Sequence, residues 1–204
     1  MDPQILVSTP EWVGVNKPSG WLTIPARSES PCLSEWVSAQ FPSEKIFVVH
    51  RIDRETSGVV LFARTAEAHK KAGGWFEKHQ IKKTYDCLAQ GRLRLPTFRV
   101  DLPIEGKKAV SQVDLVKNSE TAFLAQVRIV TGRRHQIRIH LSQQGHPLLG
   151  DVEYKGPQKI EVAGKSVKIN RVALHARRLE LPDGLVIEAP WPEDFQSWVE
   201  RIFE

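Results

Sequence analysis

The sequence lacks most of the features that would place a protein in a membrane, outside the cell or around a metal ion. No stretch approaches the roughly 20 consecutive apolar residues of a membrane span. The N-terminal residues MDPQILVSTPEW have neither the basic start nor the long apolar run of a secretion signal. Cysteine is scarce, and Cys32 and Cys87 have no metal-type spacing. We therefore expect a cytoplasmic protein with two buried thiols, no membrane anchor and no metal site.

Internal repeats, low-complexity segments and linkers are also missing from the sequence. Hydrophobic residues make up 41% of it, which is enough to fill a core. The length of 204 residues suits one domain, or two lobes that share one core, and we predict a single domain over residues 1–204. The seven histidines show no paired metal spacing, so we expect His135, His140 and His175 to be solvated or to pair within the core.

Positive charge is in excess. The chain has 29 Lys and Arg against 24 Asp and Glu, and a pI of about 9.3, which favours a polyanionic partner. Arginines cluster in residues 128–138 and 171–178, where apolar residues such as Ile137 and Leu174 lie between them. This pattern indicates a cationic cleft built on a packed scaffold, in contrast to a flexible basic tail.

Hydrophobic periodicity and turn residues predict a mixed α and β protein. The expected elements are strands at 4–7, 11–16, 58–64 and 83–90, at least two strands within 112–130, hairpins around 163–164 and 183–184, and helices at 33–40, from a Thr65 cap to about residue 80, and at 193–203.

Residues 134–144 alternate like a strand but are followed by Gly145 and Pro147, a typical helix stop. We predict a helix here. It would place Arg134 and Arg138 one turn apart on one side of the helix.

The densest chemical pattern is VVHRIDRETSGVVLFART, residues 48–65, in which Asp53 lies between Arg51 and Arg54. Nearby arginines favour an ionised carboxylate. Asp53 could therefore be an ion-paired residue that caps a turn, or a nucleophile. The protein-kinase loop, the P-loop and the Gly-x-Ser-x-Gly elbow do not fit this sequence. The residues alone leave both interpretations of Asp53 open.

This stretch resembles the signature of the RluA-type pseudouridine synthases, with His50-Arg-Ile-Asp53 followed by Thr56-Ser-Gly58. Order and spacing agree with that family from residue 14 to about residue 190. Ile52 replaces the usual leucine and Arg134 a common threonine, and neither change removes a chemical role. The other matching blocks are Asn16-Lys-Pro-x-Gly20, Lys83-Thr-Tyr85 with Gly91, Gly132-Arg-Arg-His-Gln-Ile-Arg-Ile-His140, Gly145-His-Pro147, Gly150-Asp-x-x-Tyr154, and Arg171 with Leu174-His-Ala176.

The resemblance implies both a fold and an activity. The fold is α+β, with a curved mixed, mainly antiparallel sheet, flanking helices and a central RNA-binding cleft. The activity is the isomerisation of specific uridines in structured RNA to pseudouridine. We expect no S4-type RNA-binding domain, because 13 residues precede the first motif. We also expect no cofactor and no metal, since the reaction moves no electrons to a cofactor and hydrolyses nothing.

Catalytic roles follow from the same resemblance. Asp53 matches the nucleophile, which would attack either the ribose anomeric carbon or the uracil ring. Tyr85 matches the aromatic residue that stacks on the target base and can take the C5 proton. Arg138 matches the arginine that pairs with the catalytic carboxylate. On composition alone, Tyr85 would be a packed strand residue and Arg138 a surface charge on a helix.

Further residues are expected to contact RNA. Arg51 matches a residue that enters the space left by a flipped nucleotide, and Leu174 an apolar residue against the base pocket. The remaining RNA contacts expected from the motifs are Lys17, His50, Arg133, His135 and Gln136. The expected partner is a stem-loop of tRNA or ribosomal RNA, bound by a monomer.

Two other functions stay open on the sequence alone. An RNA-binding protein without activity could share the scaffold, although Asp53, Tyr85 and Arg138 are all present. A retaining glycosidase would need a second carboxylate within about 5.5 Å of Asp53, and Glu55 and Asp151 are the candidates.

Overall fold

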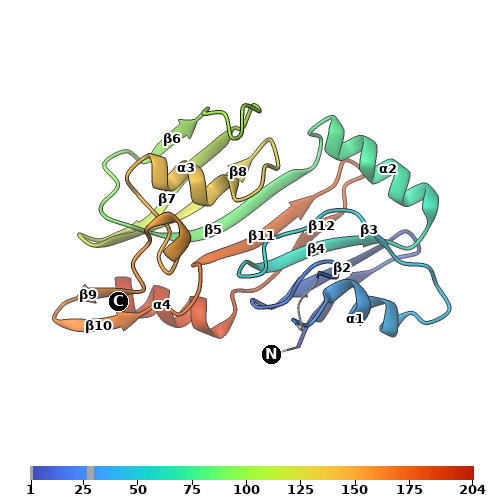
Figure 1. Cartoon of the computed structure of the whole chain (residues 1–204), viewed down its shortest axis with the longest axis horizontal. Coiled ribbons are helices and arrows are strands. Elements are labelled where there is room, and N and C mark those ends of the chain that lie inside the picture. The colour runs from blue at the N-terminus through green and yellow to red at the C-terminus, as the bar shows by residue number, and fades with distance from the viewer. Residues whose placement is uncertain (1, 27–29) are drawn as a thin grey trace. The chain divides into compact units, whose positions relative to one another are not determined.

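Two compact units make up the computed structural model, which describes residues 2–26 and 30–204 (Figure 1). Unit 1 contains the chain up to Lys82 together with Ala176–Pro190. Unit 2 contains Lys83–His175 together with Trp191–Glu204. Both units combine helices with antiparallel strand pairs, which confirms the predicted α+β class. The expected single domain over residues 1–204 stays a prediction.

Unit 1 is built on strands in the order β1-β2-β4-β11, with β3 beside β4 and β12 beside β11. The pairing of β2 with β4 places Lys17 opposite Gly58, so the first motif ends beside the strand that follows Asp53. All seven residues of β4 are buried, as its continuous apolar run predicts. The strand bounds are β1 Gln4–Ser8, β2 Trp12–Lys17, β3 Phe47–Val48, β4 Ser57–Ala63, β11 Leu174–Glu180 and β12 Val186–Glu188.

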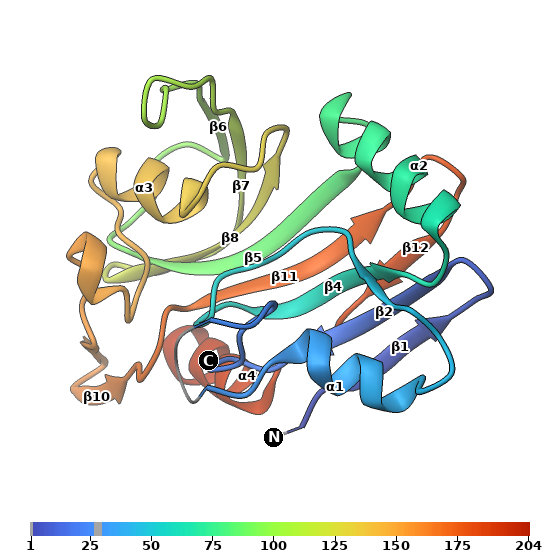
Figure 2. The same cartoon turned by 45° about the vertical axis from the view of Figure 1, so that its right-hand side comes forward.

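Two helices belong to unit 1, α1 Leu33–Gln40 and α2 Ala66–Glu77. Thr65 caps α2, since its Oγ1 accepts a hydrogen bond from the amide of Ala68 at 3.0 Å, a contact worth about 1 kcal/mol. Ala68 and Ala72 then bury one side of α2 in the core of unit 1, and α2 packs against β3 and β4 (Figure 2).

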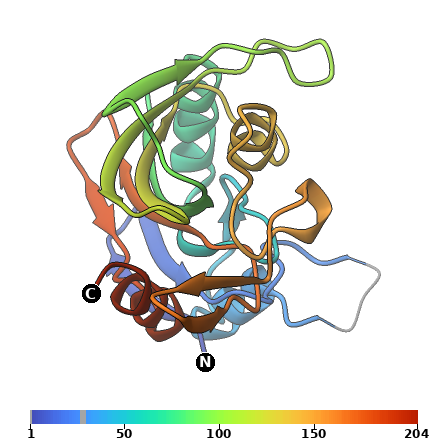
Figure 3. The same ribbon diagram turned by 90° about the vertical axis from the view of Figure 1, so that its left-hand side faces the viewer.

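Unit 2 is built on antiparallel strands in the order β5-β8-β7-β6. Neighbouring residues of β5 point to opposite faces of this sheet. Cys87 packs with the cluster that includes Ile137 of α3, whereas Leu88 packs with the cluster that includes Trp198 of α4. Figure 3 shows α4 beside the β9–β10 hairpin. The bounds are β5 Lys82–Gln90, β6 Thr97–Val100, β7 Ser111–Asn118, β8 Ala122–Ile129, α3 Gln136–Gln143, η1 Val152–Tyr154, β9 Lys159–Val162, β10 Lys165–Lys168 and α4 Glu193–Phe203.

Most expected elements are confirmed, including both hairpins and the helices at 33–40 and 193–203. Cys32 and Cys87 are buried free thiols, and burial raises the pKa of Cys87. The expected position of Arg134 is wrong: α3 begins at Gln136, because His135 adopts a left-handed conformation with φ of 53°. Arg134 therefore precedes the helix, and it does not lie one helical turn from Arg138.

Candidate active site

The loop between β3 and β4 carries Asp53, whose side chain is partly buried. A turn bond from the amide of Thr56 to the carbonyl of Asp53, 3.1 Å long, shapes the loop around it. On the other side, the buried residue Ile52 exchanges two bonds with Thr23: its amide donates to Oγ1 at 3.3 Å, and Oγ1 donates to its carbonyl at 3.1 Å. The backbone on both sides of Asp53 is thus fixed by hydrogen bonds within unit 1.

Lys17 binds the backbone of the same loop. Its side chain is 0% exposed, and Nζ donates to the carbonyls of Pro18, Trp21 and Arg54 at 2.9, 2.8 and 3.1 Å. A buried ammonium requires such oxygen partners to offset its lost hydration. We expected Lys17 to contact RNA. In its observed position it ties the first motif to the residue after Asp53, and an RNA contact would require these bonds to open.

His50 and Gly58 fix the two ends of the loop. The Nε2 atom of His50 accepts the amide of Leu61 at 3.0 Å, and its ring centroid lies 5.3 Å from that of Phe76. Gly58 has a φ of +113°, and a Cβ there would lie 2.2 Å from the carbonyl oxygen of Ala176. Only glycine fits this position. Arg51, between these anchors, is exposed.

Tyr85 lies on β5 opposite Val127 of β8, is partly exposed, and packs against the core cluster that contains Leu174. Leu174 itself is 4% exposed. Lys83 precedes Tyr85 by two residues on the same face of the strand. Its Nζ donates to the carbonyl of Thr131 at 3.2 Å, and burial lowers the pKa of Lys83 to about 8. We had not predicted a role for Lys83, although its place in the second motif marked it.

Arg138 is buried on α3 and forms a two-pronged ion pair with Asp151. Nε donates to Oδ2 at 2.7 Å and Nη2 to Oδ1 at 2.8 Å, and Nη2 also donates to Glu153 at 2.8 Å. The guanidinium lies 4.9 Å from the ring centroid of Tyr154. Burial alone would lower the pKa of Arg138, but the bonds and charges of both carboxylates raise it well above its usual value. Arg138 is therefore a fixed cation and not a mobile surface charge.

Gln136 uses both ends of its amide within unit 2. Its Oε1 accepts from the hydroxyl of Thr131 at 2.7 Å and from the amide of Arg133 at 3.1 Å. Its Nε2 donates to the carbonyl of Val110 at 2.9 Å and to the hydroxyl of Ser111 at 3.1 Å. Because Gln136 is 3% exposed, it shapes the loop before α3, whereas we expected it to contact RNA.

His135 and Arg133 flank Gln136 and are more accessible. The Nδ1 atom of His135 lies 2.9 Å from the hydroxyl of Tyr154, and Nε of Arg133 donates to the carbonyl of Lys108 at 3.1 Å. Both side chains are partly exposed. RNA contact by these two residues stays a prediction.

Two arginines of the second cluster, Arg171 and Arg178, form ion pairs. Arg171 is 8% exposed, forms a two-pronged pair with Asp194 at 2.7 and 2.9 Å, and lies 5.2 Å from the ring centroid of Trp198. Arg178 pairs with Glu180 and Glu188. We expected this cluster to line an RNA-facing surface, but Arg171 instead fixes the start of α4.

The two carboxylates considered as partners of Asp53 in a glycosidase are both engaged. Asp151 is 0% exposed and bound to Arg138, and Glu55 forms an exposed ion pair with Arg54 at 3.0 Å. Within residues 2–26 and 30–204, no group of three or more His, Cys, Asp or Glu side chains is arranged to hold a metal. In the same residues, none of the helices has the length and apolar character to cross a membrane.

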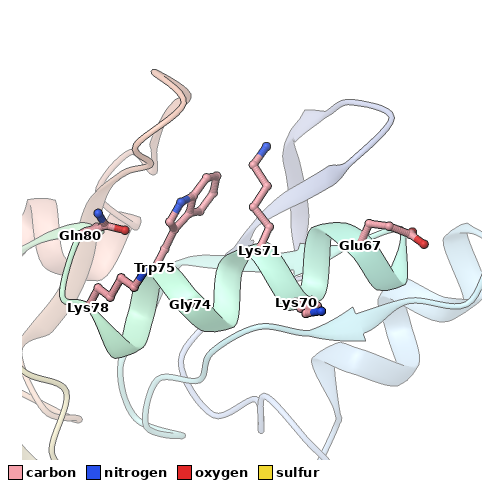
Figure 4. A pocket seen from close by; sticks show the side chains of 7 residues that line it. All are labelled: Glu67, Lys70, Lys71, Gly74, Trp75, Lys78 and Gln80. Atoms are coloured by element: carbon pink, nitrogen blue, oxygen red, sulfur yellow. The ribbon is translucent and has the colours of Figure 1, made fainter.

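A shallow cavity of about 490 Å³ lies on α2 in unit 1 (Figure 4). Its lining contains none of the predicted site residues. Lys71 is central to it, with Nζ 4.9 Å from the ring centroid of Trp75 and in ion pairs with Glu11 at 3.2 Å and Asp183 at 3.5 Å. Lys71 is thus held by contacts that belong to unit 1 alone.

The predicted site residues fall into two groups, each built within one unit. Unit 1 holds the loop with its braces, and unit 2 holds the strand and helix residues. The first group is Lys17, His50, Arg51 and Asp53; the second is Tyr85, Arg133, His135, Gln136, Arg138 and Leu174.

Comparisons with known proteins identify the family to which this chain is similar. The family model described as RNA pseudouridylate synthase matches residues 11–143. RNA pseudouridine synthase YhcT of Bacillus subtilis is 31% identical over 93% of this chain and 68% of its own length. tRNA pseudouridine synthase C of Salmonella typhimurium is 31% identical over 98% of this chain and 88% of its own length. Dual-specificity RNA pseudouridine synthase RluA of Vibrio cholerae is 30% identical over 82% of this chain and 72% of its own length.

Solved structures support the fold. The human RNA pseudouridylate synthase domain containing 4 superposes with a TM-score of 0.82 at 23% identity, covering 97% of this chain and 92% of its own. The human RNA pseudouridylate synthase domain containing 1 superposes with a TM-score of 0.78 at 22% identity, covering 100% and 88%.

Proposed function

The chain belongs to the RluA-type family of RNA pseudouridine synthases, and from this premise we propose that Asp53 is its nucleophile and a uridine in an RNA stem-loop its substrate. The observation that carries the proposal is the bracing of the Asp53 loop. Lys17 and Thr23 bind the backbone of the residues on either side of Asp53, and His50 ties the start of the loop to Leu61, while Asp53 itself is partly exposed. A nucleophile held in this way needs little reorganisation to meet a bound base.

The proposed reaction is an isomerisation in which atoms balance within the uridine. Asp53 attacks the ribose anomeric carbon or the uracil ring and forms a C–O bond, and the bond between the anomeric carbon and N1 breaks. The C–O bond to Asp53 breaks again by the end of the reaction, which restores the carboxylate. The base rotates and rejoins through C5, which loses its proton, while N1 gains one. Tyr85 stacks on the base and takes the C5 proton, Leu174 supports the base from the core, and Arg138 acts as the cation paired with Asp53. Because mass and oxidation state do not change, we propose that no cofactor or metal takes part.

Target uridines inside folded RNA must first leave their stack, at a cost of a few kcal/mol. Arg51 is exposed beside Asp53 in sequence, and its guanidinium can stack and contact phosphate in the vacated space. Arg133 and His135 add RNA contacts from unit 2. The relatives' names refer to tRNA and to ribosomal RNA, and we propose a stem-loop from either class, bound by a monomer in the cytoplasm.

Mapping of pseudouridine in cellular tRNA and ribosomal RNA, with and without the gene, tests this function. We expect at least one pseudouridine to disappear when the gene is deleted and to return when the wild-type gene is restored. Purified protein separates the alternatives by product: RNA of unchanged mass that contains pseudouridine indicates isomerisation, free uracil indicates a hydrolase, and bound RNA without pseudouridine indicates a binding protein without activity.

A further inference from the structure

We infer that Asp151 is a positioning residue for pseudouridine formation, because it fixes the guanidinium of Arg138 in one orientation. The inference rests on the proposed function, in which Arg138 serves the chemistry of Asp53. Nothing in the family resemblance or the comparisons assigned Asp151 this role.

The bonds between the two side chains leave Arg138 little freedom. Nε and Nη2 donate in parallel to the two carboxylate oxygens of Asp151, and the second hydrogen of Nη2 goes to Glu153. The ring of Tyr154 covers one face of the guanidinium, 4.9 Å away. Because these contacts fix the plane of the guanidinium, Asp151 also sets the direction of Nη1.

Asp151 is itself rigid. It is 0% exposed, its amide donates to the carbonyl of Leu148 at 3.2 Å, and its own carbonyl accepts from Gly156 at 2.7 Å. A Cβ at Gly150 would lie 1.9 Å from the carbonyl oxygen of Arg171, and one at Gly156 would lie 1.8 Å from that of Leu148. The turn that carries Asp151 is therefore packed too tightly to accept a side chain at Gly150 or at Gly156.

Asp151 and Tyr154 together form a cradle around the guanidinium of Arg138, and Tyr154 is also held in place by hydrogen bonds. Its hydroxyl lies 2.9 Å from Nδ1 of His135, and the hydroxyl of Ser142 donates to its backbone carbonyl at 3.0 Å. An error of about 1 Å in the position of a reacting group can cost about 100-fold in rate. The contacts of Asp151 and Tyr154 can hold the guanidinium of Arg138 within such a distance.

A matched ion pair in unit 2 separates positioning from stability. Arg171 and Asp194 form the same two-pronged contact at 2.7 and 2.9 Å, with a Trp198 ring 5.2 Å from the guanidinium. Both arginine side chains are 7% exposed, although Asp194 is more exposed than Asp151. Replacing either aspartate should cost stability, but Arg171 has no part in the proposed chemistry.

The test compares Asp151→Asn with Asp194→Asn at a temperature where both are folded, using unmodified tRNA and ribosomal RNA transcripts. Asp151→Asn should lower kcat by about 100-fold with little change in RNA affinity, whereas Asp194→Asn should keep kcat within about twofold. Equal kcat values per folded molecule would overturn the inference. Activity of the wild type and its loss in Asp53→Asn test the proposed function separately. If both are seen, the proposed function stands whatever the result for Asp151→Asn.

A double-mutant cycle shows whether Asp151 acts through Arg138. If it does, Asp151→Asn should add at most about twofold to the loss caused by Arg138→Ala. Losses that multiply would overturn the inference. Should Asp151→Asn fail to fold, Tyr154→Leu removes the ring from the same cradle and Tyr154→Phe keeps it. The Leu variant should lose more kcat than the Phe variant, and equal losses would count against the cradle.

Discussion

Single residues in this protein carry buried charge. The ammonium of Lys17 and the guanidinium groups of Arg138 and Arg171 are nearly removed from solvent, and each meets oxygen atoms at 2.7–3.1 Å. A buried charge is tolerable only when such partners replace water. These three cations therefore hold loops and helices in place, and they are not available to an RNA backbone without rearrangement.

Lys17→Met provides a stability prediction at this scale. The substitution keeps a long apolar side chain but removes the donor shared by the partly buried carbonyls of Pro18, Trp21 and Arg54, which should lower the free energy of unfolding by about 2–3 kcal/mol. Lys82→Met is the control, because its side chain is 76% exposed and its change should stay within about 0.5 kcal/mol. Equal shifts in the denaturant midpoint would show that the Lys17 bonds do not support the loop.

His140 gives a prediction for pH. Burial lowers its pKa, and its ring bonds to the hydroxyl of Ser111 at 2.9 Å and the carbonyl of Leu102 at 3.0 Å. The unfolded chain then binds a proton that the folded chain excludes, so stability should fall as the pH drops below the ordinary pKa of about 6.5. Between pH 7 and 5, wild type should lose more unfolding free energy than His140→Gln. A His69→Gln control, at an exposed position, should follow wild type.

Replacing Arg51 and replacing Arg138 should slow the reaction differently on folded and on loosely structured RNA. Arg138→Ala should slow isomerisation even in a loosely structured oligonucleotide, because Arg138 serves the chemical step. Arg51→Ala should cost much more on a folded hairpin of the same sequence, since an unstacked base needs no extraction. Single-turnover rates of both variants on both RNAs measure this. A loss at Arg51 that is equal on the two substrates would assign it to positioning Asp53 instead.

At the scale of elements, local signals predicted most of the secondary structure. Leu33–Gln40 and Glu193–Phe203 are helices as expected, and the side chain of Thr65 caps α2. The start of α3 was misplaced because the left-handed backbone at His135 depends on the surrounding loop bonds and not on helix propensity. β3, with two residues, and β6, with four, were missed because strands this short carry no reliable periodicity.

The whole molecule decides which motif residues are exposed, and this could not be read from the sequence. Lys17 meets the carbonyl of Arg54, 37 residues away, and Gln136 meets Val110, 26 residues away. Sequence motifs identified both residues as important, but their burial depends on these distant contacts. The roles assigned to Asp53, Tyr85 and Arg138 came from family resemblance and stay predictions until variants are measured.

RNA binding by the whole molecule should depend on the basic residues that remain accessible. Arg133→Ala should weaken binding and make the fall of affinity with salt shallower, because each phosphate contact releases counterions. Arg92→Ala, whose side chain is 59% exposed and paired with Glu120, is the control and should leave the slope unchanged. Affinity is measured from low to high salt for each variant. If the slope for Arg133→Ala equals that of wild type, Arg133 lies outside the RNA contact.

The most direct test of the central claim is pseudouridine formation by purified wild type and Asp53→Asn on unmodified tRNA and ribosomal RNA transcripts. We expect wild type to form pseudouridine in RNA of unchanged mass. Asp53→Asn should form none, although the variant should bind the RNA within a few-fold of wild type, because the binding charges lie elsewhere. Turnover by folded Asp53→Asn at the wild-type rate would contradict the assignment of Asp53 as the nucleophile.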